Sequence, residues 1–282
     1  MSMGFIEPID YLERWRQLVE ARDDQGRRLD SQYGRSDEWA GARADRFRQL
    51  AAHTHDDDPL LAHLRPRLRP NDVVLDVGAG PGRHTIPLAQ QVARVVAVEP
   101  SAAMRAHLTE GLTRAGVANV EVVAAGWPAA SVKPADVVIC SHVVYGVADI
   151  APFVRKLDAV TRRHCAMVLR YGQREAQILD LFAKVWGEKR CLAPTCLDLL
   201  GALAQVGILA NLTVVPFTIG QRFPDLDAAV AQVHADLLNP TSPTAERIIR
   251  EDLAARLVPI DGALAFPRSP AYAGLLWWDK GD

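Results

Sequence analysis

The sequence lacks long apolar runs, clustered cysteines and blocks of basic residues. No apolar stretch reaches the roughly eighteen residues that a membrane-spanning helix needs, and the acidic N-terminal stretch MSMGFIEPIDYLERW is unlike a secretory signal. Lys and Arg total 32 against 34 Asp and Glu, which gives a net charge of −2 and no visible footprint for nucleic acid. We therefore expect a cytoplasmic protein with a small or neutral partner and no membrane or nucleic-acid contact.

The cysteines are few and scattered, with no CxxC pair among them. This usage favours reduced packing residues over a disulfide framework or a zinc site. The four positions are Cys140, Cys165, Cys191 and Cys196.

The chain divides into two parts, and at 49% hydrophobic it can bury one sizeable core. Residues 1–70 carry apolar positions at spacings of three and four, which predict an N-terminal helical segment. Within it, DDDPLLAHL predicts a helix that starts with Asp58 as N-cap and Pro59 at the first helical position. Residues 71–282 form the second part, in which helical stretches between about 225 and 258 predict an insertion over residues 220–262.

Short β-branched runs dominate the region from about residue 70 to 172. They are VVLDV, RVVAVE, VEVVAA, ADVVICS and AMVLR. They alternate with helical segments, and their continuous apolar composition is typical of parallel strands buried on both faces. NLTVVPF and YAGLLWW predict two more strands further along the chain. The pattern predicts an α/β fold.

The stretch VLDVGAGPGRH places three glycines at alternate positions after a predicted strand, with Asp76 just before them. Its GxGxG spacing differs from the GxGxxG of dinucleotide sites, and no Gly-Lys-Ser/Thr follows as in a P-loop. A carboxylate at this turn would repel a diphosphate but attract an ammonium group. S-adenosylmethionine combines an adenosine with a cationic amino-acid tail. We therefore expect the glycines to let the backbone approach this cofactor and Asp76 to hold its amino group.

Two later stretches agree with an adenosine ligand. Glu99 ends the second predicted strand, where its carboxylate can accept both ribose hydroxyls. Gly126 and Trp127 end the third strand and could line an adenine slot, with Met104 covering the other side. The alternative for Trp127 is an ordinary core aromatic.

VLDVGAGPGRH, VVAVEPS and ADVVICSHVVYGV together resemble the first three motifs of class I S-adenosylmethionine-dependent methyltransferases, over about residues 71–172. The resemblance implies a Rossmann-like seven-stranded sheet whose last strand is antiparallel, with helices on both faces. The N-terminal helices and the insertion would form a cap over the carboxyl edge of the strands. By resemblance, Asp76, Gly78, Gly80 and Gly82 match the cofactor loop, and Glu99 matches the ribose-binding acid. The other cofactor-binding residues that we predict are Ala79, Pro100, Met104, Gly126, Trp127, Ser141 and His142. Many members place an acidic residue after the third strand; Ala125-Gly126-Trp127 stands there instead, so we expect backbone or water contacts to adenine.

The methyl group of a sulfonium is already activated, so such an enzyme mainly aligns the acceptor and excludes water. A general base is needed only for an acceptor that is protonated at neutral pH. CSHVVYG follows the fourth strand, and His142 and Tyr145 are its candidate catalytic residues. The alternative is that His142 only shapes the cofactor pocket.

The predicted function is methylation of a small molecule at oxygen or nitrogen, with S-adenosylhomocysteine as the product. Two alternatives stay open: a non-catalytic S-adenosylmethionine-binding regulatory or partner protein, and an NAD(P)-dependent dehydrogenase, which the glycine spacing and Asp76 disfavour. The acceptor and the oligomeric state, including a homodimer, also stay open.

Two pairings in the N-terminal segment have ordinary explanations. Trp39 and Arg43 lie four apart on a predicted helix, which indicates a surface pair more often than a cofactor contact. A solvated helix start explains a cluster of histidines and aspartates better than a metal site does. That cluster is His53, His55, Asp56, Asp57 and Asp58.

Overall fold

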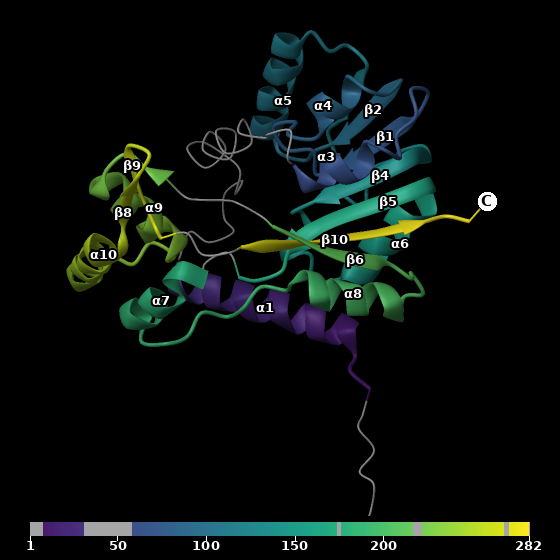
Figure 1. Cartoon of the computed structure of the whole chain (residues 1–282). Coiled ribbons are helices and arrows are strands. Elements are labelled where there is room, and N and C mark those ends of the chain that lie inside the picture. The colour runs from purple at the N-terminus through teal and green to yellow at the C-terminus, as the bar shows by residue number, and fades with distance from the viewer. Residues whose placement is uncertain (1–7, 31–57, 174–175, 217–221, 268–270, 282) are drawn as a thin grey trace, which may run out of the picture.

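The computed structural model describes residues 8–30, 58–173, 176–216, 222–267 and 271–281. Its centre is a seven-stranded sheet with the order β3-β2-β1-β4-β5-β10-β6 (Figure 1). These strands are β1 (Val73–Val77), β2 (Arg94–Val98), β3 (Val120–Val123), β4 (Ala135–Ser141), β5 (Thr161–Arg170), β6 (Asn211–Pro216) and β10 (Tyr272–Asp279). The pairs from β3 to β5 are parallel, whereas β10 is antiparallel to both β5 and β6. The predicted sheet with an antiparallel last strand is confirmed.

Strand β5 begins five residues before the apolar run AMVLR that predicted it. Its first half was not predicted, because it contains two arginines. Arg163 Nη2 lies 2.6 Å from Asp72, just before β1, and Arg162 Nη1 lies 3.4 Å from Asp136 in β4. Carboxylates on neighbouring strands thus compensate charges that made the segment look unlike a buried strand.

Helices cover both faces of the sheet. They are α3 (Pro59–Leu64), α4 (Thr85–Ala89), α5 (Ala102–Ala115), α6 (Ile150–Val160) and α8 (Cys196–Gln205). Successive side chains of β1 point to opposite faces. Val74 therefore joins the apolar cluster under α3 and α4, and Leu75 joins the cluster under α6 and α8. Helix α5 packs beside β2 through Leu108. Cys140, Cys165 and Cys196 are buried free thiols, as predicted for packing residues.

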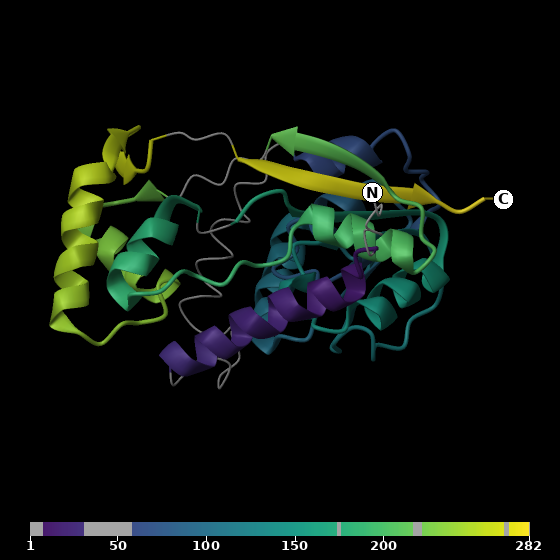
Figure 2. The same cartoon turned by 90° about the horizontal axis from the view of Figure 1, so that it is seen from below.

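The N-terminal segment contributes α1 (Tyr11–Leu29), which packs against α8 and α6 (Figures 1 and 2). Trp15 is completely buried, and its indole N–H donates to the Val147 carbonyl at 2.7 Å. The Tyr11 ring lies 2.3 Å from where a side chain on Gly201 would start, so only glycine permits this approach. Helix α3 begins as predicted, with Asp58 as its N-cap. The predicted helix that carries Trp39 and Arg43 lies outside the described residues.

A smaller lobe stands beside the sheet (Figures 1 and 2). It contains α7 (Leu179–Trp186), α9 (Leu226–Asp236), α10 (Pro243–Arg256), β7 (Arg222–Phe223), β8 (Val258–Ile260) and β9 (Ala263–Ala265). Phe182, Val233 and Leu253 belong to its own apolar cluster. The two helices expected in the insertion are present, but the lobe also includes α7 and a three-stranded sheet. Strands of two or three residues are too short to show a sequence period.

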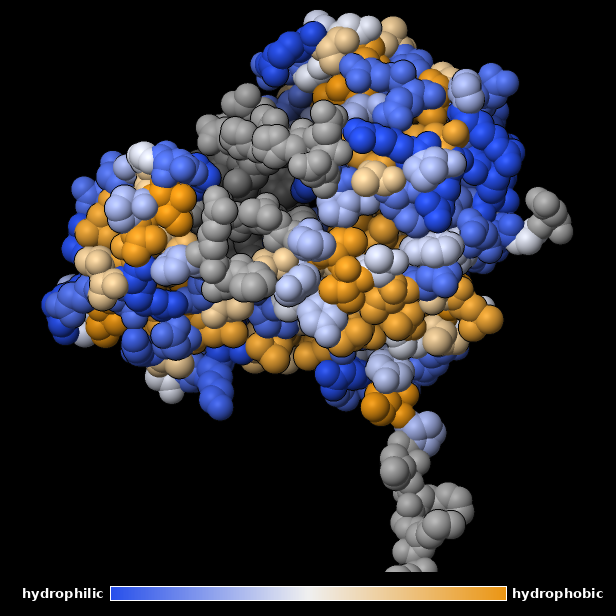
Figure 3. All heavy atoms as spheres, in the orientation of Figure 1, coloured by the Kyte–Doolittle hydropathy of each residue, from blue (hydrophilic) through white to orange (hydrophobic). Residues whose placement is uncertain are grey.

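Apolar side chains gather on the surface where β6, the edge strand, meets α8 (Figure 3). Leu209 is 85% exposed, and Val214 and Leu197 are about half exposed. An exposed edge strand offers backbone groups for pairing.

Within the described part of the chain, no helix is long and apolar enough to cross a membrane.

Candidate functional site

The glycine loop leaves the carboxyl end of β1 in a backbone conformation that favours glycine. Gly78, Gly80 and Gly82 have φ values of 77°, 56° and 94°. The N–H of Gly78 donates to the Val98 carbonyl at 2.8 Å, which ties the loop to the end of β2. A Cβ on Gly78 would lie 2.2 Å from a methyl group of Val143. Positive φ and close approach together explain why glycine occupies this turn.

Asp76 lies on β1 just below this loop and is 2% exposed. The hydroxyl of Thr85, at the start of α4, donates to its Oδ2 at 2.6 Å. Burial raises the pKa of the Asp76 carboxyl, because the charged form loses its hydration. A cation beside it would favour the charged form. Sequence reasoning did not identify Thr85, since nothing local marks a hydroxyl nine residues away as the partner.

Glu99 stands at the end of β2 and connects three parts of the site. Its Oε2 accepts the N–H of Gly80, and its Oε1 accepts the N–H of Ser101, both at 2.8 Å. Burial raises the pKa of Glu99, and these two N–H groups partly offset the effect. Ser101 in turn caps α5 by accepting the N–H of Met104. The carboxylate thus supports the glycine loop, a role that the sequence pattern did not reveal.

The predicted adenine side of the site is formed by β3 and α5. Gly126 is exposed, and so is Pro100, whereas Met104 is 2% exposed. The Trp127 indole N–H donates to the Phe153 carbonyl at 3.1 Å, and its ring meets the Phe153 ring edge-on. Trp127 therefore packs on α6, which favours its reading as a core aromatic.

Beyond β4 the chain turns at Ser141 and His142, and His142 has a φ of 58°. This left-handed conformation is uncommon for a residue with a side chain. His142 Nδ1 lies 2.9 Å from the Tyr145 hydroxyl, which also accepts the backbone N–H of Arg170 at 2.9 Å. Burial, with Arg170 and Arg83 nearby, holds the pKa of His142 well below its usual range. Burial raises the pKa of Tyr145. Both side chains are therefore neutral at neutral pH.

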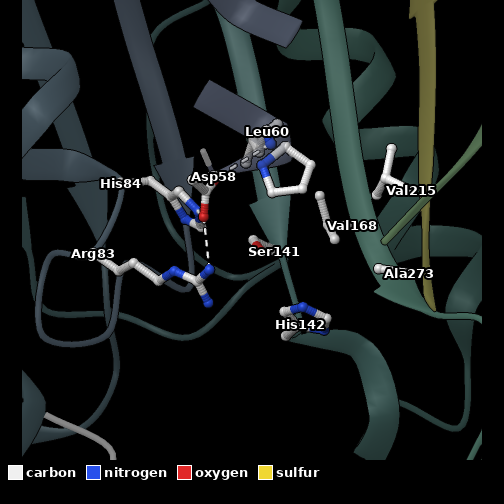
Figure 4. Close-up of a pocket in the computed structure, with 10 residues that line it drawn as sticks. Asp58, Leu60, Arg83, His84, Ser141, His142, Val168, Val215 and Ala273 are labelled. Carbon is white, nitrogen blue, oxygen red and sulfur yellow. Dashed lines mark hydrogen bonds and ion pairs between the residues drawn. The ribbon is translucent and has the colours of Figure 1, made fainter. Parts of the chain in front are cut away.

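A pocket opens beside His142 at the carboxyl ends of β4 and β5 (Figure 4). The residues that line it are Asp58, Pro59, Leu60, Arg83, His84, Ser141, His142, Val168, Val215 and Ala273. Asp58 Oδ2 accepts from Arg83 Nη2 at 2.6 Å and lies 3.3 Å from His84 Nε2, while Oδ1 accepts two backbone N–H groups of α3. Although burial opposes it, His84 and Arg83 hold the pKa of Asp58 well below its usual range. The sequence predicted Asp58 as a cap but not its contact with the glycine loop, because the two segments meet only in the fold.

Several sequence predictions lie outside the described residues. They concern Trp39, Arg43, His53, His55, Asp56 and Asp57. Among the residues that the structure does describe, no three His, Cys, Asp or Glu side chains are grouped to hold a metal ion.

Comparison with known proteins places these features in a family context. Residues 74–164 match the family model described as a methyltransferase domain. An uncharacterised protein of Haemophilus influenzae is 30% identical over 166 residues, which cover 57% of this chain. The match spans only 61% of that protein's length.

Two solved structures share the fold. Magnesium protoporphyrin IX methyltransferase from Synechocystis PCC 6803, with bound S-adenosylhomocysteine, has a TM-score of 0.55 at 15% identity and covers 87% of this chain and 97% of its own. Coclaurine N-methyltransferase, bound to N-methylheliamine and S-adenosylhomocysteine, has a TM-score of 0.51 at 14% identity, with coverages of 98% and 90%. At such identities the likeness concerns the fold.

Proposed function

We propose that this chain, which belongs to the class I S-adenosylmethionine-dependent methyltransferases, methylates a small molecule at oxygen or nitrogen. The observation that carries the proposal is the pair of buried carboxylates at the ends of β1 and β2, on either side of a glycine loop. Asp76 and Glu99 place carboxyl oxygens at the loop. A cationic, adenosine-bearing cofactor would favour their charged forms, whereas a diphosphate would be repelled by them. When bound, S-adenosylmethionine supplies an activated methyl group.

The chain's own residues would bind and orient this cofactor. Asp76, held by Thr85, would accept the amino group of the methionine part, directly or through water. Glu99 keeps further lone pairs on its two oxygens for the ribose hydroxyls. Gly78 lets the loop lie against Val143 and leaves the loop surface open. The remaining members of the cofactor-binding set are proposed on the same arrangement, and they are Ala79, Gly80, Gly82, Pro100, Met104, Gly126, Ser141 and His142. Trp127 is left out of the proposal, because it packs on Phe153.

The hydrogen bonds of His142 suggest how it would act on the acceptor. The Tyr145 oxygen already accepts from Arg170, so its own proton is free to be donated to His142 Nδ1. The imidazole then carries its proton on Nε2 and is a donor there. We therefore assign His142 to holding and orienting the acceptor, with Tyr145 fixing its tautomer, in preference to a role as general base.

The lobe would close over the acceptor. Strand β10 points away from the lobe, and the parallel strands run opposite to β10, so their carboxyl ends face the lobe (Figure 1). Ligands of open α/β sheets bind at this edge. We propose that the lobe excludes water from the reacting groups. The described N-terminal helices, α1 and α3, cover faces of the sheet instead.

Calorimetry with S-adenosylhomocysteine and with NAD⁺, followed by a transfer screen using methyl-labelled cofactor, tests the proposal. We expect binding of S-adenosylhomocysteine only and labelling of at least one small acceptor. Binding of NAD⁺ instead would refute the proposal. Binding of S-adenosylhomocysteine with no labelled acceptor would favour the non-catalytic alternative.

A further inference from the structure

The pocket beside His142 has two chemically different walls (Figure 4). Val168, Val215 and Ala273, from β5, β6 and β10, form an apolar wall. Arg83 lies on the opposite side, and His142 lies between Arg83 and the apolar residues in this view. The enclosed part of this pocket has room for about one water molecule, so it suits the polar head of a ligand whose apolar body lies along the open side.

Arg83 is the charged group of the polar wall, and part of its hydrogen-bonding capacity is unused. Its Nη2 donates to Asp58, while its Nε is buried and has no hydrogen-bond partner among the described residues. A buried N–H of a charged group is costly to leave without an acceptor. The side chain is 25% exposed, so a ligand in the pocket can approach the guanidinium.

Asp58 positions this guanidinium and leaves a monoanion as the best match for the pocket. Its Oδ1 accepts from two backbone N–H groups and its Oδ2 accepts from Arg83, so most of its hydrogen-bonding capacity is used within the protein. Around His142 the positive groups Arg170 and Arg83 have a larger electrostatic effect than Asp58. Because Asp58 already offsets much of the Arg83 charge, the pocket suits a singly charged group better than a doubly charged one, which favours a carboxylate over a phosphate. Arginine also matches the planar geometry of a carboxylate.

Building on the proposed function, we propose that the methyl acceptor carries a carboxylate, which Arg83 binds, and that its apolar body lies against Val168, Val215 and Ala273. The carboxylate anchors the acceptor and thereby selects apolar acids over their neutral analogues.

Calorimetry on the full chain saturated with S-adenosylhomocysteine tests this selection. The probes are matched acids and primary amides: 4-hydroxybenzoate against 4-hydroxybenzamide, indole-3-acetate against its amide, and hexanoate against its amide. We expect at least one acid to bind at least tenfold more tightly than its amide. Equal affinities across all pairs, or no binding by any acid, would overturn the inference.

Variants of Arg83 separate this inference from the proposed function. Arg83→Lys keeps a cation beside Asp58 but loses the planar fork, so acid affinity should fall roughly tenfold with S-adenosylhomocysteine affinity unchanged. Arg83→Met should remove the preference for acids. Arg114→Met, an exposed arginine on α5, is the matched control and should behave as wild type. Unchanged acid binding in both Arg83 variants would overturn the inference, whereas failure of the wild type to bind S-adenosylhomocysteine would count against the proposed function itself.

Discussion

Glu99 is predicted to stabilise the fold as well as the cofactor. Replacing it with alanine removes the acceptors of the Gly80 and Ser101 N–H groups, each 2.8 Å from a carboxylate oxygen. Hydrogen bonds to a charged group contribute about 1.5–3 kcal/mol each, and relief from burying the carboxylate offsets part of that loss. We therefore expect Glu99→Ala to lower the free energy of unfolding by about 2–4 kcal/mol in the absence of ligand.

Urea unfolding followed by circular dichroism measures this loss, and calorimetry with S-adenosylhomocysteine measures the lost ribose contact. That contact should account for a further roughly 10- to 150-fold fall in affinity, or about 1.5–3 kcal/mol. Glu121→Ala is the matched control, because Glu121 lies on β3 in an exposed pair with Arg94 and should change stability by less than about 1 kcal/mol. If Glu99→Ala unfolds at the same urea concentration as the wild type, the carboxylate does not hold the loop and the reasoning is refuted.

Three further outcomes are expected. Gly78→Ala should lower the free energy of unfolding by about 2–4 kcal/mol and abolish S-adenosylhomocysteine binding, because φ is +77° and the new Cβ would lie 2.2 Å from Val143. Adding Val143→Ala should restore part of the stability in urea. No recovery would assign the loss to backbone strain alone. Burial, with Arg67 and His164 nearby, lowers the pKa of His63 to about 4. The unfolded chain protonates His63 more readily than the folded chain does. The free energy of unfolding should therefore be unaffected by His63 above about pH 6.5 and fall by about 1–3 kcal/mol as the pH drops to about 4, after discounting for partial exposure. Urea midpoints across this range should change less in His63→Gln, and an unchanged pH slope would contradict the assignment to His63. Hydrogen exchange should show protection gained in α9 and α10 when cofactor and acceptor bind, and no gain would argue against a lid.

Predictions that depended on neighbouring residues were confirmed. The apolar β-branched runs became the strands of the sheet, because parallel strands buried on both faces need continuous apolar sequence. Asp58 caps the helix that follows it, since a cap bonds only to N–H groups two or three residues away. Strand β5 was predicted too short, because its first half is charged and is compensated from other strands.

The sequence by itself determined the class of sheet, the glycine turn and the two carboxylates at its strand ends, because each is written in residues close together along the chain. Only the tertiary structure decided what those groups touch. In the fold, Thr85 donates a hydrogen bond to Asp76, and the Gly80 N–H donates one to Glu99. Arg83 donates a hydrogen bond to Asp58, the N-cap of α3. None of these contacts has a signal in the sequence. The contact of Glu99 exists because the parallel strands β1 and β2 bring their carboxyl ends to one edge of the sheet.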